Sequence, residues 1–295
     1  RILNSSGELY DLGRLGMDPG SYEIWQKMIH RSHGIILVTG PTGSGKTTTL
    51  YASLAELNRT DVKIITIEEP IEYQMEGITQ IQVQPKIGLS FATVLRSLLR
   101  QDPDIMLVGE TRDQETAEIT IRTALTGHLV FSTLHTNDAA GAIPRLVDMG
   151  VEPFLVASSL IGVIAQRLVR VICPNCKDEV APQHELLAAL GYRPDDYTGV
   201  SFFKGRGCEE CKYLGYSGRT GIYPGFDYTP GIRSRNQALR HAAGDGNPPP
   251  VWLGACQIRA DHSRRAASSH AGGCVPRKIY YRRTQQRKEG NRSRI

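Results

Sequence analysis

The sequence lacks any apolar run long enough to cross a bilayer. None of its uninterrupted apolar stretches approaches the roughly 18 residues that a membrane-spanning helix needs, and its first residues lack the basic-then-apolar order of a signal peptide. We therefore expect the chain to work in the cytoplasm. Internal repeats and low-complexity blocks are also missing. With 295 residues, 40% of them hydrophobic, the chain can form one large globular domain and a smaller appendage.

Net positive charge is missing from most of the chain. Residues 1–224 contain 21 Lys and Arg against 26 Asp and Glu, a net charge of −5, whereas residues 225–295 contain 14 against 4, a net charge of +10. Proteins that bind nucleic acid without sequence preference gain affinity largely by neutralising phosphates. We therefore expect no nucleic-acid binding by the body of the protein.

The basic segment is poor in the residues that build a core. Leu, Ile, Val and Phe account for 9 of the 71 residues after Pro224, below the roughly 20% that accompanies folded domains. We predict that residues 224–295 form an atypical basic tail that is disordered. One hypothesis is a shifted reading frame, and the rival is a functional tail for anionic lipid or nucleic acid. Cys256 and Cys274 have no C-x-x-C partners, and we assign them no metal.

Between residues 34 and 170, apolar runs alternate with segments of helical period, which predicts an α/β domain with a largely parallel sheet. We expect buried strands at residues 35–38, 62–67, 105–108 and 129–133. Helices are expected over Leu50, Leu54 and Leu57, after Ser90, and around residues 117–125, where Ala117, Ile121 and Leu125 recur. Residues 1–33 are interpreted as a connector, from a domain that precedes Arg1, followed by a short helix that begins near Asp18 and Pro19.

A glycine-rich loop lies between the first expected strand and the following helix. Its sequence fits G-x-x-x-x-G-K-S/T, in which glycines let backbone N–H groups surround phosphates. Lys46 can reach the β and γ phosphates of ATP, and the Thr47 hydroxyl can ligate magnesium. The alternative is a glycine-rich turn without function. The expected nucleotide-binding residues are Gly40, Pro41, Thr42, Gly43, Ser44, Gly45, Lys46, Thr47 and Thr48.

Two expected strands end in acids. Glu68 follows Ile64–Ile67, and Glu110 follows Ile105–Gly109. Each acid emerges at the carboxyl end of its strand, where doubly wound sheets place ligands, and magnesium and the attacking water need a carboxylate there. Strand ends also commonly carry carboxylates that only face solvent, so each acid taken alone leaves both interpretations open.

Three further segments, in order after the loop, give the sequence a family resemblance. Residues 66–73 resemble an aspartate box, with Glu69 where Asp is usual. Residues 99–113 resemble an atypical Walker B box, with Thr111 where Ile is usual, and residues 126–137 resemble a histidine box. Residues 1 to about 223 thus resemble the secretion ATPase superfamily, specifically general secretion pathway protein E and the pilus-extension ATPases.

The resemblance implies roles for individual residues and for the assembly. Glu110 would act on the attacking water and Glu68 would support the same water, while His128 and His135 would sense the γ-phosphate. Arg112 and Arg100 would contact phosphate or a neighbouring subunit, although a lone arginine is more often a solvated ion pair. In this family an arginine finger comes from an N-terminal domain across a subunit boundary. The resemblance also implies a homo-hexameric ring acting on inner-membrane components, with peripheral contact at the inner membrane.

Two C-x-x-C pairs follow the α/β region, with 31 residues between them. Four thiolates in two such turns suit one tetrahedral, structural zinc ion. Disulfides are the alternative that a reducing cytosol disfavours, and a redox dithiol would need only one pair. Many extension ATPases carry such an insertion, which agrees with the resemblance. The expected zinc ligands are Cys173, Cys176, Cys208 and Cys211.

Together these features predict a RecA-like P-loop NTPase core at residues 34–170, with a zinc-binding tetracysteine appendage at residues 171–223. The predicted function is ATP hydrolysis, which powers protein secretion across the outer membrane or pilus assembly. One alternative is a RecA-type DNA translocase or helicase, which DNA-stimulated ATPase activity would favour. The other is a nucleotide-binding scaffold subunit that no longer hydrolyses ATP, and intact Lys46, Thr47 and Glu110 argue against it.

Overall fold

The computed structural model describes residues 11–228 of the 295-residue chain. Most of the predicted basic tail, residues 229–295, therefore lies outside the described residues. The described chain forms two compact units: residues 11–169 with 220–228 make the first, and residues 170–219 make the second. Among the described residues, every helix is too short or too polar to cross a bilayer.

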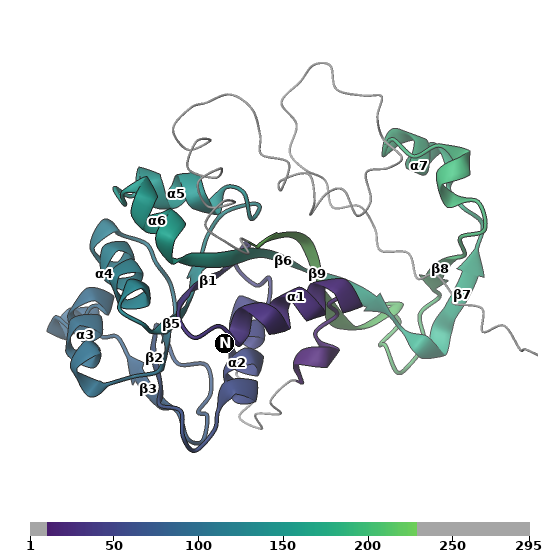
Figure 1. Cartoon of the computed structure of the whole chain (residues 1–295). Coiled ribbons are helices and arrows are strands. Elements are labelled where there is room, and N and C mark those ends of the chain that lie inside the picture. The colour runs from purple at the N-terminus through teal and green to yellow at the C-terminus, as the bar shows by residue number, and fades with distance from the viewer. Residues whose placement is uncertain (1–10, 229–295) are drawn as a thin grey trace, which may run out of the picture. The chain divides into compact units, whose positions relative to one another are not determined.

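The first unit is built around a seven-stranded sheet with the order β3-β2-β4-β5-β1-β6-β9 (Figure 1). Its strands are β1 (Gly34–Thr39), β2 (Ile64–Glu68), β3 (Thr79–Gln82), β4 (Ile105–Val108), β5 (Leu129–Leu134), β6 (Leu160–Ile172) and β9 (Tyr216–Tyr228). Its helices are α1 (Pro19–Ile29), α2 (Lys46–Leu57), α3 (Phe91–Leu98), α4 (Gln114–Leu125), α5 (Ala142–Asp148) and α6 (Pro153–Ser159), with 3-10 turns at Leu12–Arg14, Pro85–Ile87 and Leu99–Gln101.

The expected α/β architecture with a mostly parallel sheet is confirmed, since the pairs β1–β5, β1–β6, β2–β3, β2–β4 and β4–β5 are all parallel. The four expected strands are present, but the second begins at Ile64 rather than Val62, because the Val62 amide closes a turn onto the Arg59 carbonyl. Strands β3, β6 and β9 extend the sheet beyond the four that were expected.

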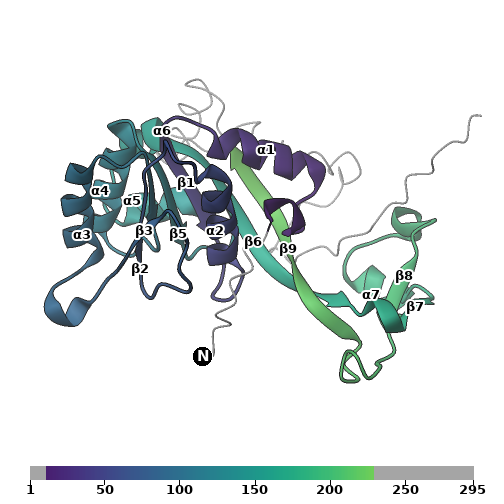
Figure 2. The same ribbon diagram turned by 90° about the horizontal axis from the view of Figure 1, so that it is seen from below.

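Helices cover both faces of the sheet, and each face has its own apolar core (Figures 1 and 2). On one face, α3 and α4 pack through residues such as Leu95 and Ile121; on the other, α1 and α2 pack through Trp25, Leu50 and Leu54. Each fully buried aliphatic side chain contributes about 1.5–3 kcal/mol relative to exposure. This burial fixes α2, and with it the glycine-rich loop, against the sheet.

Capping side chains begin the helices where the sequence predicts. The Asp18 carboxylate accepts hydrogen bonds from the first-turn amides of α1, and Pro19 occupies the first helical position. Ser90 and Asp113 cap α3 and α4 in the same way. The helix expected around residues 117–125 is present as α4; Ala117 and Ile121 are buried, while Leu125, its last residue, is 41% exposed.

The parallel register brings the ends of β1, β2, β4 and β5 to one edge of the sheet, where they meet the middle of β6. Thr39 at the end of β1 pairs with Leu134 of β5 and with Ala165 of β6. On the other side of β5, Ile67 of β2 pairs with Val108 of β4. Residues that follow these positions therefore meet at the carboxyl edge, where parallel sheets place ligands.

The second unit is small and contains a two-stranded antiparallel sheet of β7 (Lys177–Val180) and β8 (Phe202–Gly205). Helix α7 (His184–Ala189) and 3-10 turns at Pro174–Cys176 and Pro194–Tyr197 complete it. The buried side chains of Leu187 and Tyr197 and the cysteine sulfurs provide its core. So little apolar area leaves a unit of this size in need of another source of stability.

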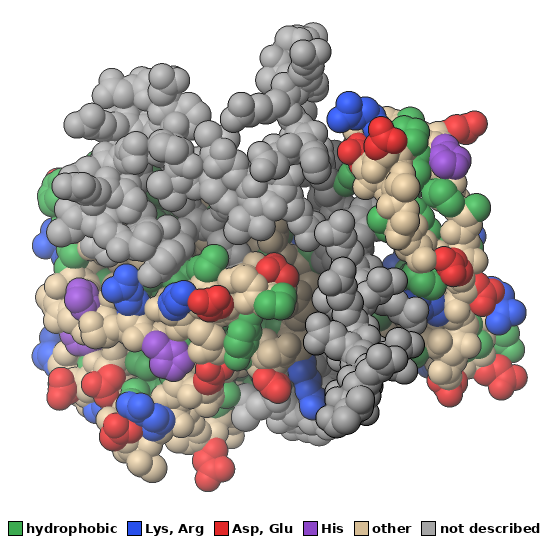
Figure 3. All heavy atoms as spheres, turned by 45° about the vertical axis from the view of Figure 1, so that its right-hand side comes forward, with side chains coloured by type: hydrophobic (Ala, Val, Ile, Leu, Met, Phe, Trp, Pro, Cys, Tyr) green, Lys and Arg blue, Asp and Glu red, His purple; other side chains and the backbone are tan. Residues whose placement is uncertain are grey.

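Charged side chains of both signs are interspersed on the face drawn in Figure 3. Exposed ion pairs among the described residues include Lys27 with Glu23 at 2.6 Å and Arg59 with Asp61 at 3.2 Å. Pairs exposed to this degree add at most about 1 kcal/mol each.

Candidate functional site

The loop from Gly40 to Gly45 has a backbone that only glycine adopts easily. Gly40, Gly43 and Gly45 have φ angles of 147°, 78° and 88°, in the region where a side chain is disfavoured. A Cβ atom on Gly40 would also lie 2.4 Å from the carbonyl oxygen of Gln166 on β6. The loop leads directly into α2, whose first residue is Lys46. Free amides at this helix end, with the helix dipole, favour an anion.

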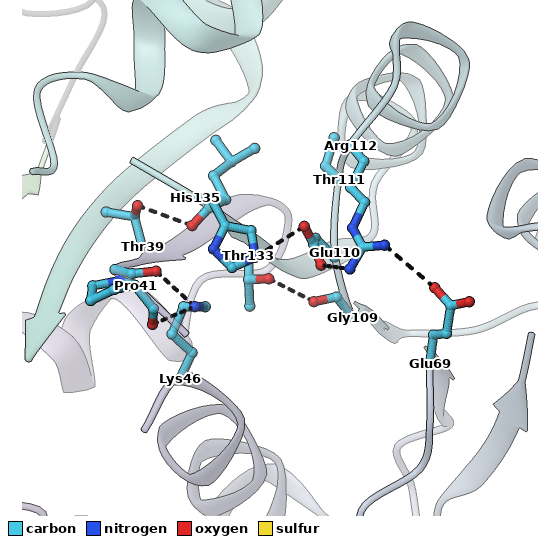
Figure 4. A network of polar contacts seen from close by, with 12 residues as sticks. Thr39, Pro41, Lys46, Glu69, Gly109, Glu110, Thr111, Arg112, Thr133 and His135 are labelled. Carbon is cyan, nitrogen blue, oxygen red and sulfur yellow. Dashed lines mark hydrogen bonds and ion pairs between the residues drawn. The ribbon is translucent and has the colours of Figure 1, made fainter. Parts of the chain in front are cut away.

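Lys46 points back over this loop (Figure 4). Its Nζ donates hydrogen bonds to the carbonyl oxygens of Gly40, at 2.8 Å, and Pro41, at 3.2 Å. Burial lowers the pKa of Lys46, the Glu110 carboxylate opposes that shift, and the Arg167 guanidinium adds to it. Thr47 and Thr48 follow in the first turn of α2 and are half-buried.

Glu110 lies two residues after β4 and is held from both sides (Figure 4). One of its oxygens lies 2.6 Å from an Arg112 nitrogen and the other 3.1 Å from Nε2 of His135. Burial raises the pKa of Glu110, but the hydrogen bond from Arg112 and the neighbouring His135 outweigh it, so the net pKa is lowered. Arg112 also pairs with Glu69 at 3.7 Å. The site thus presents an ionised carboxylate in a fixed orientation.

Glu68 is in a different environment from Glu110, although both follow apolar strands. Its side chain is buried, one oxygen accepts a hydrogen bond from Thr66 at 2.6 Å and from Gln80 at 3.3 Å, and the other accepts one from Tyr51. Tyr51 lies on α2 and Gln80 on β3, so Glu68 ties the helix after the loop to two strands. Tyr51 was not predicted to contribute to the site, because it lies in none of the recognised sequence motifs.

The structure separates the two predicted histidines. His135 follows the end of β5 and contacts Glu110, whereas His128 precedes the start of β5, where its Nδ1 lies 3.0 Å from the Thr123 carbonyl oxygen. His128 is therefore at the opposite edge of the sheet from the glycine-rich loop. Arg100, in the turn before β4, is exposed and lies before the start of its strand too. The sequence already indicated this placement, because His128 and Arg100 each precede the strand that they flank, whereas parallel sheets place ligands beyond the carboxyl ends of their strands.

Gln166, in the middle of β6, is a second residue that the motifs did not assign to the site. Its side chain is buried, and its Oε1 accepts a hydrogen bond of 2.9 Å from Thr49 in the first turns of α2. Through this contact the middle of β6 is attached to the helix that follows the loop.

The four predicted cysteine ligands meet in the second unit. Three pairs of sulfurs are separated by 3.7–3.8 Å, and all four lie within 4.8 Å of one another. A disulfide would need about 2.05 Å, whereas four sulfurs at about 2.3 Å from one zinc ion lie roughly 3.8 Å apart. Backbone amides of Cys208 and Gly215 donate to the Cys211 sulfur and lower its pKa to about 6, which favours the thiolate that metals bind.

A glycine-rich loop between a parallel strand and a helix, with a lysine over the loop and an oriented carboxylate at the same sheet edge, defines a P-loop nucleotide-binding protein. The type II/IV secretion system protein family matches residues 1–242 of the chain. The chain belongs to this family.

Individual relatives support the same family assignment. Over 223 residues the chain is 54% identical to type II secretion system protein E of Dickeya dadantii. The aligned residues make up 76% of this chain and 44% of that relative. It is 50% identical, over the same length, to the type IV pilus assembly ATPase PilB of Thermus thermophilus, of which it covers 25%. The chain thus spans less than half the length of these curated relatives.

Among solved structures, the pilus retraction motor PilT with bound ADP has a similar fold. It matches with a TM-score of 0.55 and 28% identity, over 87% of this chain and 64% of that chain.

Proposed function

We propose that this chain is the ATP-hydrolysing part of a motor that powers type II protein secretion or pilus assembly, built on a RecA-like core. The observation that carries the proposal is the position of Glu110, held ionised by Arg112 and His135 at the same sheet edge as Lys46. A carboxylate there can orient and activate a water molecule for attack on the γ-phosphate.

The proposed division of labour follows from the contacts. Lys46 would exchange its two carbonyl partners for the β and γ phosphates, and the loop amides would bind the remaining phosphate oxygens. The half-buried Thr47 hydroxyl would ligate magnesium, which neutralises the charge that develops on the phosphates. His135 touches the catalytic carboxylate, which supports its assignment as a γ-phosphate sensor.

Glu68 and His128 fit direct roles in hydrolysis less well than Glu110 and His135 do. Glu68 shares its oxygens among three donors, so we propose that it supports the site by positioning α2. His128 lies at the other edge of the sheet, and any contact that it makes with a nucleotide would involve a neighbouring subunit.

The test compares two variants. Lys46→Ala removes the phosphate-binding charge, so nucleotide affinity and turnover should fall together. Glu110→Gln keeps the shape of the side chain, so it should still bind ATP while single-turnover hydrolysis slows by about 10²–10⁴-fold. Lys86→Ala and Glu152→Gln, at exposed positions, are matched controls. Equal hydrolysis by Glu110→Gln and the unchanged protein would remove Glu110 from the mechanism.

We also propose that the cysteine cluster binds one structural zinc ion. The sulfur separations suit four zinc–thiolate bonds, and such a site adds the stability that this small core needs. The purified protein should contain about one zinc per chain, and Cys173→Ser should lose the metal while keeping nucleotide affinity. A stoichiometric disulfide without metal under reducing conditions would contradict the assignment.

The remaining proposals concern assembly and location. We propose a homo-hexameric ring that acts on inner-membrane components from the cytoplasm, peripherally at the membrane; the names of the secretion and pilus relatives support this. Measuring oligomer size with and without ATP tests the ring. ATPase activity stimulated by DNA would instead favour the translocase alternative.

A further inference from the structure

The middle of β6 forms a second wall of the glycine-rich loop. Ala165 pairs with Thr39, so the next two residues of β6, Gln166 and Arg167, lie beside Gly40, where the loop begins. A Cβ on Gly40 would lie 2.4 Å from the Gln166 carbonyl oxygen and 3.2 Å from Nη1 of Arg167. An arginine head group therefore lies next to the first residue of the phosphate-binding loop.

The backbone of β6 is firmly held at this point. The Gln166 side chain is 2% exposed and accepts a hydrogen bond from Thr49, and its Nε2 would lie 2.8 Å from a Cβ on Gly45. Both ends of the loop, Gly40 and Gly45, are thus in close contact with this one residue. Arg167 follows it directly, and its guanidinium donates back to the Gln166 carbonyl oxygen.

Among residues 11–225, whose side chains the structure describes, Arg167 has only neutral partners. Its guanidinium donates to the carbonyl oxygens of Gln166, at 3.0 Å, and Asn137, and it forms no ion pair with a carboxylate of these residues. Its charge is close enough to Lys46 to lower the pKa of that amine. Two cations that repel each other beside a loop of free amides are stabilised together by a polyanion.

A buried hydroxyl points to the same place. The Ser44 Oγ is fully buried and is the one buried side-chain oxygen or nitrogen in the described part of the chain without a hydrogen-bond partner. It lies 2.7 Å from the position of a Cβ on Gly40, and Nη1 of Arg167 lies 3.2 Å from the same position. Buried polar groups without a partner are costly and rare in folded proteins, so a ligand atom is the natural partner for this hydroxyl.

We propose that Arg167 is a phosphate-binding residue of the same subunit, which contacts the β–γ end of the bound nucleotide beside Lys46. The inference rests on the proposed nucleotide site and adds a second cation to it. This arginine is distinct from any supplied across a subunit boundary, because it comes from β6 of the same chain and is placed by Gln166. Its planar guanidinium offers the bidentate geometry that phosphate oxygens accept.

The experiment measures binding of a non-hydrolysable ATP analogue and of AMP to the full chain at several salt concentrations. Arg167→Gln should weaken analogue binding by about tenfold to a hundredfold, reduce the steepness of its salt dependence, and change AMP binding little. Arg167→Lys keeps the positive charge but lacks the planar guanidinium that can bind two phosphate oxygens at once. It should therefore retain the salt dependence and part of the affinity. Arg122→Gln, which removes an exposed arginine from α4, is the matched control and should bind normally.

The outcomes separate this inference from the proposed function. If neither the unchanged protein nor Arg122→Gln binds the analogue, or if Lys46→Ala binds it normally, the nucleotide site itself is wrong. If Lys46→Ala loses binding but Arg167→Gln keeps the affinity and salt dependence of the unchanged protein, only the role of Arg167 is overturned. Equal losses of affinity and melting temperature in Arg167→Gln and Arg167→Lys, with the salt dependence unchanged, would show that Arg167 merely holds the Asn137 turn.

Discussion

The hydrogen bond from Tyr51 to Glu68 should be a large single contribution to the stability of the first unit. Tyr51→Phe removes only the hydroxyl and leaves the ring in its edge contact with Tyr73, whose centroid lies 4.6 Å away. The buried Glu68 oxygen that Tyr51 contacts would lose its donor, because the other two donors, Thr66 and Gln80, both contact the second oxygen.

The magnitude follows from burial. Leaving a buried acceptor without its hydrogen-bond donor costs about 1–3 kcal/mol, and both the Tyr51 and Glu68 side chains are shielded from water. We therefore expect the free energy of unfolding to fall by about 2 kcal/mol. With a urea m-value of about 1–3 kcal/mol/M, the midpoint should fall by about 1 M at unchanged m.

Urea unfolding followed by Trp25 fluorescence measures this effect in the first unit, because Trp25 is fully buried and its Nε1 donates to Ser53 on α2, at 3.0 Å. A Trp252→Phe background restricts the signal to Trp25. Tyr22→Phe is the control, since the Tyr22 hydroxyl accepts its bond from the neutral amide of Gln26 at a part-buried position; its midpoint should hardly change. Equal midpoints for Tyr51→Phe and Tyr22→Phe would refute the reasoning.

Three further predictions concern the loop, the carboxylate and alkaline pH. Gly40→Ala should destabilise the protein and abolish ATP binding because the Gln166 backbone blocks a Cβ, whereas Gly43→Ala meets no atom within 4 Å and should cost only about 1–2 kcal/mol of backbone strain; melting curves and ATP titrations compare them. Arg112→Gln removes the main contact that lowers the pKa of Glu110, so the acid limb of the pH–rate profile should move to higher pH; an unmoved limb would contradict this. Burial raises the pKa of Tyr223 to about 12, so the unfolded chain releases this proton first and stability should fall as pH rises from about 10 to 12, less steeply in Tyr223→Phe. Melting temperatures across that range, unchanged by the substitution, would disprove it.

Local patterns in the sequence predicted the elements around the loop well. Ile35–Val38 is an uninterrupted apolar run before a glycine-rich turn, and such runs form buried parallel strands. Ser90 is a good capping residue, so the start of α3 could be located, whereas the Asp113 cap of α4 was not predicted. The cysteines could be brought together from spacing alone, because each C-x-x-C turn presents two sulfurs on one side.

Long-range contacts account for what the sequence did not predict. Strand β3 is polar, with the sequence Thr79–Gln82, and lies at the edge of the sheet, so it shows no apolar run. The burial of Glu68 depends on donors from α2 and β3 that lie 17 and 12 residues away. The role of Gln166 depends on a contact with Thr49, 117 residues earlier, and no local pattern encodes such a pair.

The position of Lys46 also couples nucleotide binding to protons. In the free protein its amine is partly dehydrated and faces carbonyl oxygens, and its pKa lies below the ordinary value. A bound triphosphate favours the charged amine and would raise that pKa, so at alkaline pH each binding event should take up a fraction of a proton. The measured heat of binding should then depend on the ionisation enthalpy of the buffer, and nucleotide affinity should decline as pH rises through the lowered pKa of the free lysine.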